Sequence, residues 1–291
     1  MNISADTVKQ LRERTGAGMM ECKKALVETQ GNLEAAAELM RKSGLAKADK
    51  KAARIAAEGT VAIERSGTDA ALVEVNCETD FVARSDEFQA FARDIAKAAL
   101  GSAPGSLEAL LSASHGGAST LEHRRRDLIA KIGENIAVRR FERIQSQGKL
   151  VQYVHPGAKV AVLVDLAGDE AVAKDVAMHI AFAKPQFMSR DQVAPDVIAA
   201  ERKVLEARAA ESGKPAEIAA KMVEGGINKF LGEITLLGQP FVKDDKQTVQ
   251  KMLDAKKAKL VAYRYLVVGQ GIEKKQSDFA AEVAAMSRTA A

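Results

Sequence analysis

The middle of the chain contains an internal repeat, which constrains the fold more than any other feature of the sequence. Residues 59–76 and 148–166 share one pattern, in which an apolar stretch, a glycine and a second, more apolar stretch follow one another. This pattern is typical of a β-hairpin, because glycine readily adopts the backbone angles of a tight turn. A similar helical pattern follows each hairpin, at residues 91–96 and 172–177. Each copy therefore predicts a hairpin followed by a helix.

A third strand is expected in each copy. The apolar stretches at 136–141 and 261–268 have the length and composition of strands, and each follows the helix of its own copy. The sequence therefore predicts an α+β fold with a core of two related subdomains that contain small antiparallel sheets. We place these subdomains at residues 56–145 and 146–269.

Residues 1–55 predict a separate helical module. Glycines at 16–18 separate a first helical pattern from a second, and Gly31 ends the second before a third begins. We expect the third helix to end at Gly44, and residues 46–58 to form a charged helical linker. A module of three short helices is near the lower size limit for independent folding, which suggests that it serves in docking.

The two copies of the repeat differ between the hairpin and the helix. The second copy needs only residues 167–171, whereas the first has the longer segment 77–88, centred on Thr79-Asp80-Phe81-Val82. A phenylalanine in this polar loop has two interpretations. Phe81 either folds back into the core of its own subdomain, or it is an apolar wedge, next to the charge of Asp80, that inserts into a partner.

A further insertion lies inside the later copy, at about residues 189–229. Apolar residues at helical spacing after Pro195, followed by a turn at 212–215 and a second helical pattern, predict a short antiparallel coiled coil. At the end of the chain, residues 270–291 predict a helical module with an amphipathic helix from Asp278 to Met286.

The composition favours helices and excludes membrane spans. The 291 residues include 53 alanines, 4% aromatics and no Trp, so the core is expected to be thin and spread over several elements. The longest uninterrupted apolar run, residues 160–164, is far shorter than the ~18 residues of a membrane span, and we expect no membrane association. The N-terminus lacks a basic stretch followed by an apolar one, which makes a cytoplasmic protein the expectation.

Motifs for catalysis, metal binding and cofactor binding are scarce. Cys22 and Cys77 are far apart, and the four histidines stand at no metal-ligand spacing. Neither Gly-Lys pair fits a P-loop, and Gly269-Gln-Gly271 lacks the third glycine of a dinucleotide-binding turn. We therefore expect no catalytic residues, no metal and no cofactor, and we do not expect an enzyme.

Two further groups of residues have alternative interpretations. The basic run Arg124-Arg125-Arg126 is either a solvated helix face or a patch that contacts phosphates, although the net charge is only +4. Met19 and Met20 either belong to the core of the N-terminal module or form an adaptable contact surface.

Four separated motifs stand out along the chain: TGAGMMECKKAL at 15–26, NCETDFVAR at 76–84, MHIA at 178–181 and GQPFV at 238–242. Together they resemble the motifs of the translation elongation factor Ts family, in the same order and along nearly the whole chain. The resemblance implies a guanine-nucleotide exchange factor for elongation factor Tu. It also implies a UBA-like N-terminal module, two related core subdomains, a coiled-coil insertion and a C-terminal helix.

The resemblance also implies roles for individual residues. It assigns Asp80 and Phe81, flanked by Thr79 and Val82, to a loop that intrudes near the Mg²⁺ and GDP site of the partner GTPase. One departure is Gly226, where the family commonly has Arg, and we expect it to make the exit from the helical hairpin more flexible. His179 is expected to be structural. The other implied partner contacts are Arg12, Met19, Met20 and Lys23 in the N-terminal module, His155 and Val242 in the core, and Met286 in the C-terminal helix.

Two other classes remain as alternatives. The first is a translation-associated RNA-binding protein that uses its basic helix patches, although the resemblance leads us to expect no direct binding of nucleic acid. The second is an enzyme that acts on a small molecule, for which the sequence contains no motif.

Overall fold

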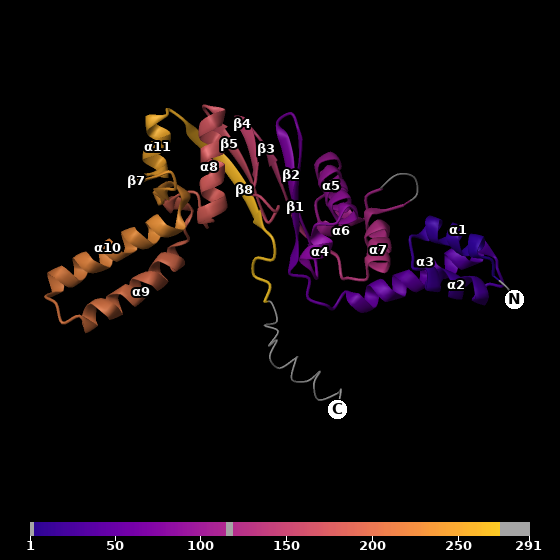
Figure 1. The fold of residues 1–291 in the computed structure, drawn as a ribbon. Helices are drawn as coiled ribbons and strands as arrows, with labels where there is room; N and C mark the ends of the chain where they lie inside the picture. Colours follow the sequence, from indigo (N-terminus) through magenta and orange to yellow (C-terminus); the bar gives the residue numbers. More distant parts are fainter. Residues whose placement is uncertain (1–2, 115–118, 274–291) are drawn as a thin grey trace. The chain divides into compact units, whose positions relative to one another are not determined.

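The described part of the chain has an α+β fold, which confirms the predicted class (Figure 1). The computed structural model describes residues 3–114 and 119–273. By its internal contacts the chain divides into two compact units. The first comprises Met1–Ala62, Val73–Phe141 and Val267–Ala291, and the second Ile63–Leu72 and Glu142–Leu266.

The three N-terminal helices begin close to the predicted signals, and the first two also end close to theirs. They are α1 (Ala5–Thr15), α2 (Met19–Glu28) and α3 (Leu33–Lys51). The hydroxyl of Ser4 accepts the N–H of Thr7 at 3.1 Å at the start of α1, and a glycine with a φ of +67° follows its end. The buried faces of the three helices form a small core made of Val8, Leu11, Cys22, Ala25, Leu26 and Ala36.

The predicted end of the third helix at Gly44 was wrong, since α3 continues to Lys51. Gly44 is buried, and α3 packs against α7 (Leu121–Ile132). A Cβ atom at Gly44 would lie 3.0 Å from the Cβ of Ala130 on α7, so the glycine permits a close approach of the two helices. This packing outweighs the cost of a glycine inside a helix, which is about 1 kcal/mol.

The first copy of the repeat contains the predicted hairpin and third strand. β1 (Glu58–Ser66), β2 (Asp69–Cys77) and β3 (Ala137–Gln145) form a sheet in the order β1-β2-β3. Every residue of the central strand β2 except the first is buried, which explains its almost continuous apolar sequence. The helix after the hairpin is α5 (Asp86–Gly101), and the short helix α6 (Leu107–Leu111) precedes α7. The fully buried residues of α5 include Phe88, Phe91 and Ile95.

The second copy has the same order of strands. β4 (Lys149–Val154), β5 (Val160–Ala167) and β8 (Lys259–Val267) form a sheet in the order β4-β5-β8. β4 and β5 are antiparallel, and their pairing starts with Lys149 opposite Leu166. The central strand is again the most buried, with all of its residues except the last buried. Both predicted hairpins and both predicted third strands are thus confirmed.

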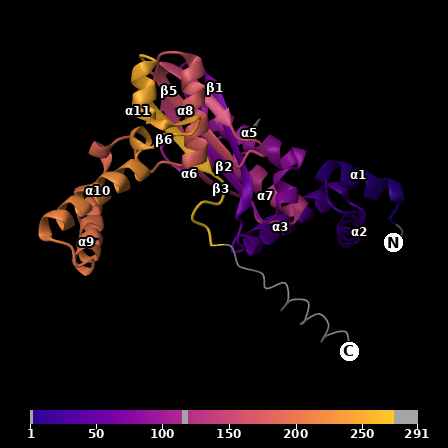
Figure 2. The same ribbon diagram turned by 60° about the vertical axis from the view of Figure 1, so that its left-hand side comes forward.

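The predicted helical hairpin is present in the second unit (Figure 2). α8 (Glu170–Ala183) packs against β4 and β5, and the hairpin follows as α9 (Pro195–Glu211) and α10 (Ala216–Ile234). Proline is the first residue of α9, and Gly213 between the helices has a φ of +64°. α10 continues beyond the predicted end of the insertion because its last turns join a small core. That core includes Val193, Ile227 and Leu231.

Gly226 lies inside α10, so the expected flexible exit from the hairpin is instead a regular helix. A Cβ atom at this position would lie 2.8 Å from the side-chain methyl carbons of Leu205 on α9. The glycine therefore has a packing role, since it lets the two helices approach more closely than a larger residue would.

Short elements complete the second unit. β6 (Pro240–Phe241) and β7 (Asp244–Thr248) form a two-stranded antiparallel sheet, and α11 (Val249–Ala255) follows. Single 3-10 turns occur at Arg190–Gln192 and Leu236–Gly238. The first of these turns precedes α9, and the other short elements lie between α10 and β8 in the sequence.

Two further predictions concern the C-terminal helix and membrane spans. The helix predicted from Asp278 to Met286 lies outside the described residues. Within residues 3–114 and 119–273, no helix combines the length and the apolar character that a bilayer span requires.

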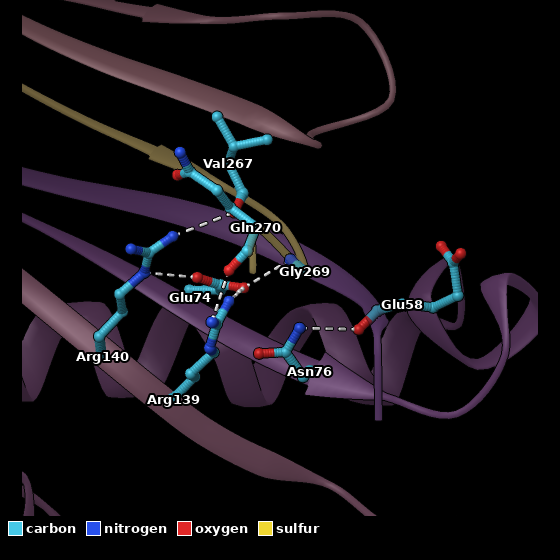
Figure 3. A network of polar contacts seen from close by, with 8 residues as sticks. All are labelled: Glu58, Glu74, Asn76, Arg139, Arg140, Val267, Gly269 and Gln270. Carbon is cyan, nitrogen blue, oxygen red and sulfur yellow. Dashed lines mark hydrogen bonds and ion pairs between the residues drawn. The ribbon is translucent and has the colours of Figure 1, made fainter. Parts of the chain in front are cut away.

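A buried carboxylate joins three segments of the first unit (Figure 3). Glu74 of β2 is fully buried, and its carboxylate accepts hydrogen bonds from Arg139 Nη1 at 3.1 Å and Arg140 Nε at 2.7 Å. It also accepts the N–H of Gly269 at 2.7 Å. Both guanidinium groups donate in addition to backbone carbonyls within residues 267–270, at 2.6 and 3.1 Å. The network therefore fixes the chain after β8 to β2 and β3.

The turn at Gly269 requires glycine for two reasons. Its φ is +71°, and a Cβ atom would lie 2.4 Å from the carbonyl oxygen of Ala57. Burial raises the pKa of the Glu74 carboxyl, but the hydrogen bonds from Gly269 and the two arginines outweigh it, and the net pKa lies below the usual value. Gly269 thus contributes its backbone N–H to the binding of a buried carboxylate.

Glu74→Gln is predicted to lower the free energy of unfolding at about pH 7 by about 3 kcal/mol, because it leaves two partly buried arginines without their counter-charge. The pKa of Glu74 is lower in the folded protein than in the unfolded chain, where it is about 4.3. The carboxylate therefore contributes its full stabilisation at pH values above the unfolded pKa. This contribution is lost as the pH falls through the folded-state pKa. Urea unfolding followed by circular dichroism, at about pH 7 and about pH 3, measures both effects.

The matched control is Glu142→Gln, which removes an exposed glutamate whose partner Arg264 is 3.5 Å away. An exposed pair of this kind contributes at most about 1 kcal/mol. Equal losses of stability for the two variants at neutral pH would contradict the role assigned to Glu74.

Candidate partner-binding site

The segment inserted in the first copy forms a single helical turn, α4 (Asp80–Ala83), where the sequence predicted a loop. Thr79 is its N-cap, and its hydroxyl accepts the N–H of Val82 at 3.4 Å. Asp80 in the first turn forms an ion pair with Arg84 at 2.8 Å. A capping threonine and an acidic first residue both favour a helical turn at this position.

Phe81 points into solvent. Its side chain is 83% exposed, whereas the neighbouring Ala83 is buried. The interpretation in which Phe81 folds back into its own subdomain is therefore wrong. Thr79 is also exposed, and Asp80 and Val82 are half-buried. The four predicted residues thus form one small surface with an aromatic side chain at its most exposed point.

Acidic residues that the sequence analysis did not single out anchor this turn. Glu134, which directly follows the glycine that ends α7, accepts hydrogen bonds from the backbone of Glu78 and Thr79 and from the Thr79 hydroxyl. Glu78 in turn accepts the N–H of Asn135. The sequence signal that could have pointed to Glu134 is Gly133. A glycine often ends a helix, and the chain after it then turns toward another segment.

The predicted contact residues of the N-terminal module are exposed. Arg12 lies on α1, and Met19, Met20 and Lys23 lie in the first half of α2, with exposed fractions of 44% and 76% for the two methionines. The interpretation of these methionines as core residues is therefore wrong. Val27 is also exposed and shares a helix face with Met20 and Lys23, because residues three and four apart are neighbours on a helix. Val27 was not among the predicted contacts.

The predicted residues of the second unit lie on two different elements. His155 follows β4, is exposed, and has its Nδ1 3.0 Å from the hydroxyl of Tyr153. Val242 follows β6, is half-exposed, and donates its N–H to Nδ1 of His179 at 3.1 Å. Phe182 on α8 is a further exposed aromatic residue that was not among the predicted contacts.

His179 is buried, and both of its ring nitrogens have partners. Since Nδ1 accepts the N–H of Val242, the proton of the neutral ring is on Nε2, which donates to Gln239 Oε1 at 2.9 Å. The side-chain nitrogen of Gln239 donates to the carbonyl of Glu233 at 2.7 Å, which fixes the orientation of the amide. Burial lowers the pKa of His179, and the bond with Gln239 opposes this only in part. The ring positions the segment that carries Val242.

The basic run lies on α7, and its side chains have acidic partners. Arg124 pairs with Asp94 of α5, and Arg125 and Arg126 pair with Glu122 at 2.7 and 2.9 Å. The three side chains are only 17–34% exposed. Because two carboxylates already offset most of this positive charge, the basic run gives little support to RNA binding.

The described residues contain no group of three or more His, Cys, Asp or Glu side chains that could hold a metal ion. Cys22 and Cys77 are both buried, and neither forms a disulfide. The fold and the surfaces described above define an α+β protein whose candidate site consists of exposed side chains suited to contact with another protein.

Comparison with known proteins identifies the family. The family model described as Elongation factor TS matches residues 78–270. The chain is 56% identical over 292 residues to Elongation factor Ts of Methylococcus capsulatus, and 55% identical over 292 residues to that of Alkalilimnicola ehrlichii, with 99% of both chains covered in each case. It is 55% identical over 285 residues to that of Bordetella petrii, with 97% of both chains covered. The chain therefore belongs to the elongation factor Ts family.

The free energy of unfolding is predicted to fall as the pH is lowered from about 7 to about 5, and His179→Gln should remove part of this dependence. The folded-state pKa of His179 is lowered, so the unfolded chain binds a proton near pH 6.5 while the folded ring stays neutral. Urea unfolding of both proteins at several pH values measures the difference. The same pH dependence in both proteins would contradict the assignment of a neutral ring.

Proposed function

We propose that this protein is a guanine-nucleotide exchange factor for elongation factor Tu. It binds the GTPase in its GDP-bound and nucleotide-free forms and promotes GDP release and GTP loading during polypeptide elongation. Membership of the elongation factor Ts family supports this function. The observation that carries it is Phe81, an aromatic side chain that is 83% exposed on a turn anchored by the rest of the first unit.

The physical basis of exchange is thermodynamic linkage. If the factor binds the nucleotide-free GTPase more tightly than the GDP-bound form, GDP must bind the factor-loaded GTPase more weakly by the same ratio. GTP then enters the empty site and the factor dissociates. The process needs no covalent step, so the factor requires no catalytic group or cofactor of its own.

The Asp80–Phe81 turn is proposed to act where the GTPase holds Mg²⁺ and GDP. A bound Mg²⁺ is a large local charge that helps to hold the phosphates, so a small displacement of the element that supports it weakens nucleotide binding. An exposed aromatic ring can occupy a gap between elements of the partner, and the adjacent carboxylate of Asp80 can interact with polar groups at the rim. Thr79 and Val82 flank these two residues and complete the contact.

Other residues are proposed to hold the partner while the turn acts. In this proposal residues 1–55 are a UBA-like docking module, 56–145 and 146–269 are core subdomains, and 270–291 are a C-terminal helical module. The docking contacts are Arg12, Met19, Met20 and Lys23 in the first module, His155 and Val242 in the second subdomain, and Met286 near the end of the chain.

The protein is expected to accelerate GDP release from elongation factor Tu, and Phe81→Ala is expected to reduce the maximal rate at saturating factor by at least about tenfold, because the wedge is lost. Stopped-flow fluorescence of a labelled GDP gives the rate directly. The matched control is Phe182→Ala, which removes another exposed phenylalanine, on α8, and should leave the maximal rate unchanged. Unchanged release with Phe81→Ala would rule out the wedge.

Met20→Ala is expected to raise the Kd for the GTPase by about fivefold, because it removes an exposed apolar contact from α2. Isothermal titration calorimetry measures the affinity. A point substitution is a more specific test than a deletion of the module, because α3 continues to Lys51 and packs against α7, so a deletion would also remove this packing. Met222→Ala, at an exposed methionine of α10, is the control, and equal Kd values for the two variants would argue against docking through α2.

A further inference from the structure

The turn that carries Phe81 cannot hold its own conformation. α4 has four residues, and an isolated helix of this length is unstable in water. Its capping bond from Val82 to Thr79 is long, at 3.4 Å, and the Phe81 side chain makes little contact because it is mostly in solvent. The end of the turn is fixed by Gln89, whose side chain donates to the carbonyl of Ala83 at 2.6 Å. The start of the turn needs a separate anchor.

Glu134 supplies that anchor. Its Oε2 accepts the backbone N–H of Glu78 at 3.1 Å and that of Thr79 at 2.9 Å, and its Oε1 accepts the Thr79 hydroxyl at 2.6 Å. One carboxylate thus satisfies three donors immediately before α4. Hydrogen bonds to an ionised acceptor are stronger than bonds between neutral groups, so this contact restrains the backbone more than a neutral side chain would.

Glu78 and Asn135, the neighbours of Thr79 and Glu134, form a second connection between the same two segments. The Oε1 of Glu78 accepts the N–H of Asn135 at 2.6 Å and lies 3.5 Å from Nη1 of Arg54. Asn135 is buried, and its side-chain nitrogen donates to the carbonyls of Ala52 at 3.3 Å and Arg54 at 2.8 Å. The segment after α3, the end of β2 and the start of β3 are therefore connected at one place, and this place directly precedes α4.

We propose that Glu134 is a positioning residue, which orients the Asp80–Phe81 turn for insertion into the partner. The proposal rests on the exchange function proposed above. A wedge that is already ordered loses less conformational freedom when it inserts, so its anchor contributes to the rate without touching the partner. Glu134 thus acts through Thr79 and the backbone of α4, and its effect requires the Phe81 ring to be present.

A double-mutant cycle tests this dependence. Glu134→Ala, Phe81→Ala and the double variant are compared with the unchanged protein in the stopped-flow release of labelled GDP from elongation factor Tu. We expect Glu134→Ala to lower the maximal rate by about tenfold, and to lower it by less than about twofold in the Phe81→Ala background, because the wedge is then already absent. Glu134→Gln keeps one acceptor oxygen and should lie between Glu134→Ala and the unchanged protein. Glu108→Ala, at an exposed glutamate of α6, is the control and should have no effect.

Amide hydrogen exchange on the free protein gives a second readout, which does not depend on the release of GDP. Glu134→Ala should increase the exchange of the amides from 78 to 83 while those of α5 stay protected, and Glu134→Gln provides the same test if the alanine variant does not fold. Equal slowing by Glu134→Ala with and without Phe81, or unchanged amide exchange at 78–83, would overturn the positioning role. Failure of the unchanged protein to accelerate GDP release would instead overturn the exchange function on which the role rests.

Discussion

The buried carboxylate of Glu74 is the interaction on which the first unit depends. An ionised carboxylate in a protein interior is strongly unfavourable unless charged and polar donors surround it. Here the donors come from β3 and from the chain after β8, so β2 is satisfied only when these segments meet (Figure 3). The network therefore stabilises one arrangement of segments that are far apart in the sequence. Its central residue, Glu74, lies on β2, the strand that precedes α4.

The same strand explains how an exposed aromatic residue can be kept in a defined place. Phe81 is mostly in solvent, so its own packing does not hold it. Its backbone is instead fixed from two sides, by the buried strand β2 before it and by the carboxylate of Glu134 next to its N-cap. The unit thus separates two requirements: the buried residues provide rigidity, and the exposed residues remain available for a partner.

The features that could be predicted from the sequence are those that depend on local patterns. Both hairpins, both third strands and the helical hairpin follow from apolar periodicity and from glycine and proline at the ends of elements. The prominence of Phe81 followed from comparing the two copies of the repeat. Predictions failed where a glycine had two possible uses. Gly44 and Gly226 were expected to end or loosen a helix, whereas each permits a close helix contact, with Ala130 and with Leu205.

The sequence by itself determined the α+β class and the order of the elements, because periodicity, capping and turn residues act within a few positions of the chain. Only the tertiary structure decided that Phe81 is exposed and not buried, that the arginines of α7 face carboxylates, and that Glu134 anchors the turn before α4. These outcomes depend on contacts such as that between Glu134 and Thr79, 55 residues apart in the sequence. No local pattern specifies such a contact, because its free energy depends on burial and on which donors the fold brings together.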